Sequence, residues 1–293
     1  MEKVAGVQCT VGESPTWHAA EGAWYWVDIP ARRIWRLDYA SGATRCWNTQ
    51  EMAACVSPCA GGGLLAGMET GVFRLALNED GSVQAVRLAA PPAAELGEGM
   101  RFNDGRCDRQ GRFWAGTMFM DMAAARAVGN LYRYSVAGGL STPFVSGMLT
   151  QNGLAFSPRG DVMYLSDSHP QRRMVWAFDY DTASGTPHNK RIFADLGMQR
   201  GRPDGAAVDA DGCYWTCAND GGQLQRYTPA GLLEREIALP MAKPSMCSFG
   251  GPDLSTLLVT SIDPGAAPQD GWAGSVLLLR PGVQGVAETP FAG

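Results

Sequence analysis

Four side chains with metal-binding oxygen atoms recur at corresponding places in repeated segments of the sequence: Glu13, Asn103, Asn152 and Asp204. Each precedes a turn that opens a short aromatic strand. Corresponding positions in a rotationally repeated fold can meet on one axis. Two carboxylates and two amides that meet there would suit a divalent cation, because carboxylate and amide oxygens are the ligands that Ca²⁺, Mg²⁺ and Mn²⁺ prefer.

A cation held in this way would support hydrolysis. Three or four protein ligands leave coordination positions open, and an open cation can polarise a carbonyl group or lower the pKa of bound water. A nearby carboxylate can accept the proton of that water. The sequence has only three histidines and neither a G-x-S-x-G nor a dinucleotide-type glycine pattern. Hydrolysis of an ester or lactone is therefore the simplest reaction that these residues could carry out.

The segments that hold these residues belong to six repeats. The repeats begin near Glu13, Ala54, Asn103, Asn152, Asp204 and Ser245. Their interval of about 40 to 50 residues is the period of propeller blades. Each repeat contains a turn, an apolar strand and a further strand. With the weaker strands between them, the pattern predicts an all-β, six-bladed β-propeller with four-stranded antiparallel blades.

The propeller model places the cation in the central channel. We expect the four oxygen-bearing residues to lie just before the innermost strands, and residues 4–9 to complete the last blade. No linker or shift in composition divides the chain, so we expect one domain over residues 1–293. Aspartates at hairpin positions, such as Asp80, Asp108, Asp209 and Asp211, are expected to be turn residues. Glu13 and Asp204 facing a channel without a cation would be unfavourable.

Composition limits the partners and the location. The formal net charge is −5, and no basic stripe is present, so nucleic acid is not an expected partner. No apolar segment approaches the length of a signal peptide core or a membrane span, so no membrane partner is expected either. The eight cysteines are scattered through a long chain, which favours reduced thiols. We expect a cytoplasmic protein; the oligomeric state stays open.

Six short motifs occur in order along nearly the whole chain. They are GESP at 12–15, RFNDG at 101–105, AGTM at 115–118, NG at 152–153, PDG at 203–205 and CSFGGPD at 247–253. In these motifs the chain resembles the gluconolactonase and senescence-marker-protein family, which includes regucalcin and bacterial sugar lactonases. The resemblance implies a divalent-metal-dependent hydrolase that opens a sugar lactone to the corresponding aldonic acid.

The resemblance also implies roles for individual residues. Glu13, Asn152 and Asp204 would hold one divalent cation, with Ca²⁺ favoured over Zn²⁺, Mn²⁺, Mg²⁺ or Fe²⁺. Asp204 would also be the general base, while Arg101 and Asn103 would contact the substrate. Asp121 takes the place of an acidic substrate-binding residue. Its neighbours Phe119, Met120 and Met122 are apolar, which would favour a smaller or less polar lactone.

Three alternative functions remain open. The same site could hydrolyse another ester, a larger lactone or an organophosphate. The protein could bind calcium in a regulatory role without turnover. It could also be a propeller scaffold for protein partners, but that function does not require a polar cluster in the channel, so we rank it last.

Overall fold

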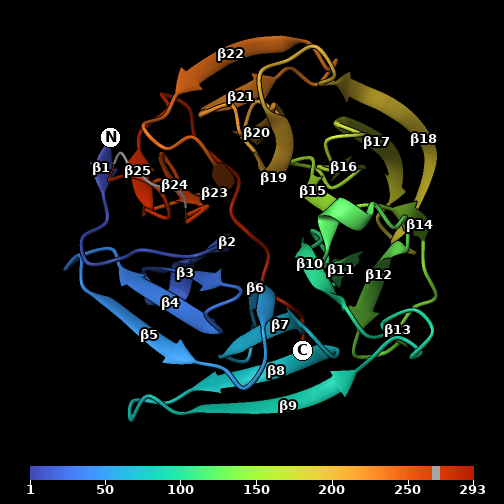
Figure 1. The fold of residues 1–293 in the computed structure, drawn as a ribbon. Coiled ribbons are helices and arrows are strands. Elements are labelled where there is room, and N and C mark those ends of the chain that lie inside the picture. The colour runs from blue at the N-terminus through green and yellow to red at the C-terminus, as the bar shows by residue number, and fades with distance from the viewer. Residues whose placement is uncertain (266–270) are drawn as a thin grey trace.

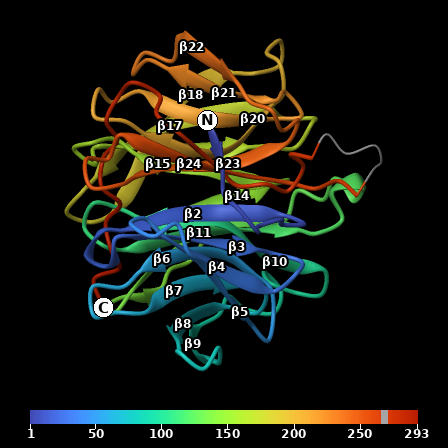
Figure 2. The same cartoon turned by 90° about the vertical axis from the view of Figure 1, so that its left-hand side faces the viewer.

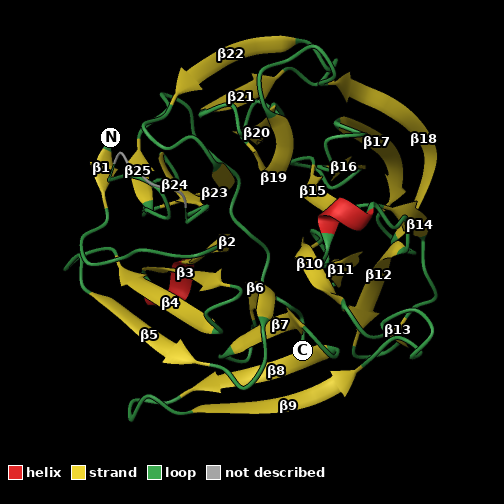
Figure 3. Ribbon diagram, in the orientation of Figure 1, coloured by secondary structure: helices red, strands yellow, loops and turns green. Residues whose placement is uncertain are grey.

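Six antiparallel sheets form a ring around a central channel in the computed structural model, which describes residues 1–265 and 271–293 (Figure 1). The prediction of an all-β, six-bladed propeller is confirmed. Helix in the described residues is limited to two 3₁₀ turns, η1 (Ala19–Glu21) and η2 (Met122–Ala124), as Figure 3 shows. The division into a single domain over residues 1–293 remains a prediction.

The strands of each blade follow one another along the chain. Blade 1 consists of β2 (Gly12–His18), β3 (Ala23–Asp28), β4 (Arg33–Asp38) and β5 (Thr44–Asn48). Blade 2 consists of β6 (Ala53–Pro58), β7 (Leu64–Met68), β8 (Val72–Leu77) and β9 (Val83–Ala89). Blade 3 consists of β10 (Met100–Cys107), β11 (Phe113–Phe119), β12 (Gly129–Ser135), β13 (Gly139–Leu140) and β14 (Val145–Met148).

The second half of the ring repeats this order. Blade 4 consists of β15 (Gln151–Phe156), β16 (Val162–Asp167), β17 (Met174–Asp181) and β18 (Thr186–Asp195). Blade 5 consists of β19 (Arg202–Val208), β20 (Tyr214–Asn219), β21 (Gln223–Tyr227) and β22 (Leu233–Ala238). Blade 6 consists of β23 (Pro244–Gly250), β24 (Thr256–Ser261), β25 (Leu277–Leu279) and β1 (Glu2–Lys3).

The ring is closed by pairing the two ends of the chain in blade 6. Strand β1 pairs with β25, with Glu2 opposite Leu278 and Lys3 opposite Leu277. The prediction that an N-terminal strand completes the last blade is confirmed, but the strand is Glu2–Lys3; of residues 4–9, Val4 and Cys9 only donate single backbone hydrogen bonds to Val276 and Gly274. The pairing holds both ends of the chain in one blade and leaves a short outer edge, because β1 has only two residues.

The core lies between neighbouring blades. Successive residues of a strand point to opposite faces, so an inner strand whose side chains are all apolar or small can bury both faces against its neighbours. Between blades 3 and 4, for example, Trp114 and Leu131 pack with Leu154 and Phe156. Similar clusters of buried side chains join the other pairs of blades. The rigid blades then hold their innermost strands at the channel.

Each innermost strand contains a β-bulge with one extra residue relative to the second strand of its blade. Glu13 and Asn152 are the last paired residues before their bulges, and Asn103 and Asp204 lie in theirs. All four therefore lie within the innermost strands, so the prediction that they precede these strands is wrong. A bulge bends the strand and redirects side chains, which is why residues in two different phases can share one channel.

The predicted turn aspartates do form turns. Asp108 accepts hydrogen bonds from the backbone N–H groups of Gln110 and Arg112, both at 2.9 Å. Asp209 accepts in the same way from Asp211 at 3.0 Å and from Cys213 at 2.9 Å. These side chains satisfy donors that the tight turn leaves without a strand partner, which is the function predicted for them.

The two ends of the channel differ. We call the end at which the innermost strands begin the near end and the opposite one the far end. The last residues of the chain cross the far end, where Phe291 bridges to Cys59 of blade 2 and Gly285 to Asp209 of blade 5. Figure 2 shows the stacked blades from the side, with the C-terminal residues away from the N-terminal strand. The candidate residues lie among the first residues of the innermost strands, so the candidate site is at the near end.

Candidate functional site

Glu13, Asn152 and Asp204 converge in the channel from blades 1, 4 and 5. Their exposed fractions are 9%, 3% and 4%, so all three polar side chains are buried. The Asn152 Nδ2 group donates a hydrogen bond to Asp204 Oδ1. On its other side, Asp204 Oδ2 accepts a hydrogen bond of 2.6 Å from Asn219 Nδ2. The structure thus joins two of the three predicted metal ligands directly.

Asp104 adds a third carboxylate that the sequence analysis did not select. Its Oδ2 atom accepts a 2.7 Å hydrogen bond from the Leu154 N–H group of blade 4. Its Oδ1 atom is buried and has no hydrogen-bond partner among the described residues. The bulge of β10 contains Asn103 and Asp104 together. The signal for Asp104 was the NDG sequence itself, which was interpreted only through its asparagine.

Burial raises the pKa values of the three carboxyl groups. Burial is the main cause of the raised pKa of Glu13, followed by the negative charges of Asp204 and Asp104. Burial likewise raises the pKa of Asp204 to about 6, against the opposing effects of Arg202 and Asn219. The pKa of Asp104 is raised mainly by burial, and Arg106 opposes this. Carboxylates so placed are stabilised when a positive charge is added between them.

The donor set fits a divalent cation. Two carboxylates and an amide oxygen are hard ligands, and a buried carboxylate oxygen at Asp104 lacks a partner in the described chain. Over the described residues, no three His, Cys, Asp or Glu side chains are grouped as ligands of one ion. The candidate set therefore depends on Asn152, whose amide oxygen would replace a third carboxylate.

Arg101 and Asn103 lie together in β10, close to Glu13. Arg101 Nη1 donates to Asn103 Oδ1 at 2.7 Å and to the Phe102 carbonyl oxygen at 2.8 Å. Asn103 Nδ2 donates to the Gln151 carbonyl oxygen of blade 4 at 2.7 Å. Burial lowers the pKa of Arg101, and the Glu13 carboxylate opposes that shift. This pair presents fixed donors beside the candidate cation ligands.

Asp121 lies apart from this cluster. It is exposed, and its carboxylate accepts a 3.1 Å hydrogen bond from the Ala123 N–H group as the N-cap of η2. Met100 pairs with Phe119, so the loop that carries Asp121 begins at the near end of the channel. Among the described residues, no hydrogen bond links Asp121 to the buried cluster. Its predicted contact with substrate remains a prediction.

His169 fastens that loop to blade 4. The ring is buried, and Nε2 lies 3.0 Å from the Met122 carbonyl oxygen. Its Nδ1 atom accepts a 3.2 Å hydrogen bond from the Gln171 N–H group. Because Nδ1 is an acceptor, the proton is on Nε2, which donates to Met122. His169 is thus a support of the η2 loop at the near end.

The sequence analysis missed three further residues: Ser168 and Asn219, which contact the cluster, and Arg202, which contacts both of them. Asn219 ends strand β20 in the position that Asp28 and Asp167 take in blades 1 and 4. A polar residue at the end of the second strand of several repeats is a signal that alignment of the repeats could have shown. Arg202 carries a signal of the same kind, because it takes the position in blade 5 that Arg101 takes in blade 3, whereas Ser168 carries none.

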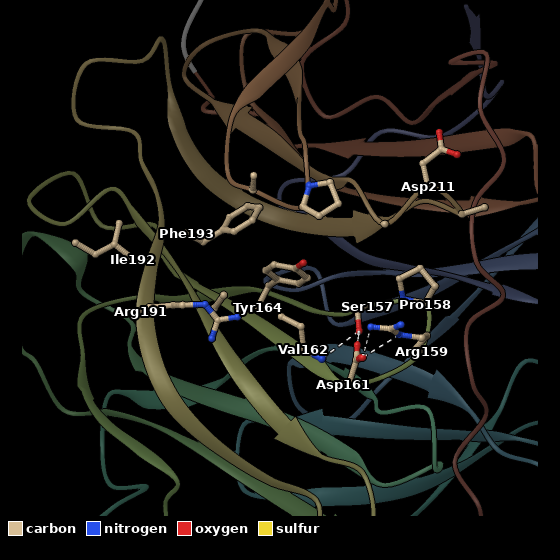
Figure 4. A pocket seen from close by; sticks show the side chains of 15 residues that line it. Ser157, Pro158, Arg159, Asp161, Val162, Tyr164, Arg191, Ile192, Phe193 and Asp211 are labelled. Atoms are coloured by element: carbon tan, nitrogen blue, oxygen red, sulfur yellow. Dashed lines mark hydrogen bonds and ion pairs between the residues drawn. The ribbon is translucent and has the colours of Figure 1, made fainter.

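A pocket of about 580 Å³ lies elsewhere, between blades 4 and 5 (Figure 4). Tyr164 and Phe193 form its apolar wall, and Pro158, Asp161 and Asp211 lie on turns at its rim. These turns follow the innermost strands, so the pocket opens toward the far end. None of the candidate site residues lines it. The pocket and the buried carboxylates are therefore separate features.

A model of one protein family matches most of the chain. The family is described as the SMP-30/gluconolactonase/LRE-like region, and the match covers residues 11–263. The chain belongs to this family. The family predicted from the six sequence motifs is confirmed.

Individual relatives agree with the family. The 6-deoxy-6-sulfogluconolactonase of Pseudomonas putida is 37% identical over 97% of this chain and 95% of its own length. The pentonolactonase of Haloferax volcanii is 31% identical over 88% of this chain and 84% of its own. A crystal structure of regucalcin from Agrobacterium tumefaciens, described as a calcium-binding protein, superposes with a TM-score of 0.88. It is 26% identical and covers 99% of this chain, which covers 97% of it.

The helices of the structure were compared with the requirements for a membrane span. Within residues 1–265 and 271–293, no helix has the length and hydropathy needed to cross a bilayer.

Proposed function

We propose that this protein is a lactonase that hydrolyses a sugar lactone to the corresponding aldonic acid with one divalent cation. The observation that carries the proposal is the convergence of Glu13, Asn152 and Asp204 from three blades on one buried, acid-rich point. Membership of the SMP-30/gluconolactonase family and two relatives named as lactonases support the reaction. The relatives' substrates support a sugar lactone as the class.

Glu13, Asn152 and Asp204 would hold the cation. Once bound, it would polarise the lactone carbonyl and lower the pKa of water. Two carboxylates from these ligands neutralise a dication formally, and Asp104 adds a negative charge nearby. Calcium is the favoured ion because the donor atoms are oxygens and because the related regucalcin structure is that of a calcium-binding protein.

Asp204 has a second role as proton acceptor. In hydrolysis, the water oxygen forms a bond to the carbonyl carbon and the bond from that carbon to the ring oxygen breaks. Asp204 takes a proton from the water and returns it to the ring oxygen, which leaves as a hydroxyl group. A carboxylate bound to a cation is a weaker base, since the charged form is stabilised. Each oxygen of Asp204 accepts one amide hydrogen bond, Oδ1 from Asn152 and Oδ2 from Asn219.

Arg101, Asn103 and Asp121 would bind the substrate. Arg101 and Asn103 are fixed by their mutual hydrogen bond of 2.7 Å and can hold a carbonyl or hydroxyl oxygen beside the cation ligands. Asp121 would contact a hydroxyl group from the η2 loop. Because this loop is fastened by His169, its exposed acid and its apolar neighbours would form one wall of the entrance.

The direct test uses protein stripped of metal. Acid release is measured with five- and six-membered sugar lactones, each with Ca²⁺, Mg²⁺, Mn²⁺, Zn²⁺ or Fe²⁺ returned separately. We expect acceleration over spontaneous hydrolysis with at least one ion and return of the slow rate after chelation. Spontaneous rates with every combination would refute the lactonase assignment.

A calcium-binding protein without turnover is the second candidate. The related regucalcin structure favours it, because that protein is described only by calcium binding. In the same assay it predicts calcium binding with no acceleration of any lactone. An enzyme for another ester or organophosphate would bind the ion and act only on those substrates.

A cytoplasmic location belongs to the same proposal. It is supported by the eight cysteines, all of which are free in the structure.

A further inference from the structure

Arg202 and Arg101 take corresponding positions in blades 5 and 3. Each directly precedes the last paired residue before the bulge of its innermost strand. Their surroundings differ, however. Arg101 contacts its own strand near the candidate cation ligands, whereas Arg202 contacts two other segments of the chain, one at Ser168 and one at Asn219 and Asp220. An arginine at the same backbone position therefore lies beside the proposed substrate site in blade 3 and connects other side chains in blade 5.

Every nitrogen of the Arg202 guanidinium group has a partner. Nε lies 2.8 Å from Asp220 Oδ2, Nη1 donates to the Ser168 carbonyl oxygen at 3.1 Å, and Nη2 donates to Asn219 Oδ1 at 3.3 Å. The side chain is 15% exposed. A planar guanidinium fork can hold several acceptors in fixed directions, which a flexible ammonium group cannot do. Arg202 is thus engaged with protein and does not present free donors to substrate.

The partners of Arg202 in turn contact two candidate cation ligands, Asn219 contacting Asp204 and Ser168 contacting Asn152. Since Asn219 Oδ1 accepts from Arg202, its Nδ2 group must face Asp204 Oδ2, which it does at 2.6 Å. Ser168 accepts from Arg202 at its carbonyl oxygen and from Asn152 Nδ2 at its hydroxyl, at 3.3 Å. Asn152 in turn donates to Asp204. Arg202, Asn219, Asp204, Asn152 and Ser168 therefore form one closed ring.

The residue type at position 219 matters for this ring. Asp28 and Asp167, at the same position in blades 1 and 4, accept hydrogen bonds from main-chain N–H groups ahead of their innermost strands. An ionised carboxylate can only accept, whereas the amide of Asn219 can donate. Blade 5 therefore has the one side chain of the three that can donate a hydrogen bond to Asp204.

We propose that Arg202 is a positioning residue for the candidate cation site. It fixes Asn219 and Ser168 in the directions that bring Asp204 and Asn152 side by side. This inference rests on the proposed function for the identity of the cation ligands. It concerns residues that never touch the cation or the substrate, and residues of this kind commonly change metal affinity or activity by about 10- to 100-fold.

The decisive variant is Arg202→Lys, which keeps the positive charge and loses the fork. Arg173→Lys is the matched control, because the Arg173 guanidinium group likewise bridges main-chain acceptors, the carbonyl oxygens of Gln199 and Gly201, but does not contact the ring. Ca²⁺ affinity is measured by titration calorimetry on metal-stripped full-length protein, and kcat and KM are measured with a sugar lactone. We expect R202K to weaken Ca²⁺ binding by about 10- to 100-fold. R173K should stay within about twofold of the wild type, and both should keep the wild-type circular dichroism spectrum.

A second variant, Asp220→Asn, tests the same proposal if R202K does not fold. Asp220→Asn removes the charge that anchors Arg202 Nε but leaves the guanidinium group in place, so a smaller loss of Ca²⁺ affinity in the same direction is expected. Wild-type affinity in R202K, or an equal loss in R173K, would overturn the proposal. If R202K does not fold, wild-type affinity in D220N overturns it. Calorimetry needs no turnover, so a protein without lactonase activity would refute the proposed function and still leave this inference decided by affinity.

Discussion

Blades 2 and 4 have similar backbones and different chemistry. Both innermost strands contain one extra residue at a bulge. In β6 the residues there are Ala53, Ala54, Cys55 and Val56, all with exposed fractions of 2% or less. In β15 the corresponding stretch begins with Gln151 and Asn152. The difference teaches that the bulge supplies a place in the channel, and only the residue type decides whether that place becomes a site.

The buried side chains of the two blades also differ in the interactions that they need. The apolar side chains of β6 are stabilised by packing alone. A buried amide or carboxylate needs a hydrogen bond or a counter-charge, and an unpaired one destabilises the fold. Asn152 finds its partners in Asp204 and Ser168, so blade 4 depends on blade 5 in a way that blade 2 does not. Substitutions around Asn152 should therefore affect function, and substitutions in β6 should affect stability.

The largest effect is expected for Asp204→Asn. The substitution removes one of two ligand charges and the proposed proton acceptor, and general bases typically contribute about 10²- to 10⁴-fold. We expect kcat/KM to fall at least about 10³-fold, with no full recovery in excess cation. The measurement is kcat/KM of wild type and D204N at increasing cation concentrations. Full recovery in excess cation would reduce Asp204 to a ligand.

The next largest effect is expected on the free energy of unfolding of Gly153→Ala, a substitution within the bulge of β15. Gly153 has φ +60°, and an added Cβ would lie 2.5 Å from Ser166 Oγ and from Tyr214 Oη. We expect the free energy of unfolding to fall by about 2–4 kcal/mol, from backbone strain and crowding together. Gly22→Ala is the control, because Gly22 has φ +59° and open space around it. Denaturant unfolding should show a loss of only about 1 kcal/mol there. Equal losses in both variants would mean that crowding at the bulge is unimportant.

Arg101→Ala should separate substrate binding from cation binding. Loss of an orienting side chain can lower kcat/KM by about 10²-fold. Ca²⁺ affinity should not fall, since Arg101 supplies no ligand and its positive charge lies close to Glu13. Kinetics and calorimetry on the same preparation measure both quantities. An unchanged kcat/KM would remove Arg101 from the substrate site.

Acid should weaken cation binding by a smaller, graded amount. A proton competes with the cation for Asp204, whose pKa is raised to about 6 in the cation-free protein. Ca²⁺ affinity should therefore fall as the pH drops through about 6, by about tenfold per pH unit for each displaced proton, and the raised pKa of Glu13 adds to this loss. Calorimetry at several pH values checks the slope. An affinity that rises toward low pH would contradict a carboxylate site.

The smallest effect on activity is expected in blade 2. Val56→Ala removes buried apolar contacts, so the free energy of unfolding should fall by about 1–3 kcal/mol. The Val56 N–H group still donates to Ser14 Oγ, at 2.9 Å in the wild type, because the substitution leaves the backbone in place. We expect kcat/KM within about twofold of the wild type. A large loss of kcat/KM in a stably folded V56A would show that blade 2 takes part in the site after all.

Part of the site could be derived from the sequence because it depends on repeated local pattern. Glu13, Asn103, Asn152 and Asp204 were found by their recurrence, and their burial together at one channel agrees with that prediction. Their roles as ligands, base and substrate contacts remain predictions. Their phase was only approximately right, since Glu13 and Asn152 precede the bulge whereas Asn103 and Asp204 lie in it.

The sequence by itself determined the blade period, the number of blades, the family and the candidate ligands, because alternation, turns and motifs are properties of neighbouring residues. Only the tertiary structure decided that Asp104 is a third buried carboxylate and that Arg202, Asn219 and Ser168 connect the ligands. Two of these contacts join blades 4 and 5: Arg202 of β19 with Ser168 after β16, and Asn152 with Asp204. Their partners are set by how the closed ring brings separate strands together, and no local pattern contains that information.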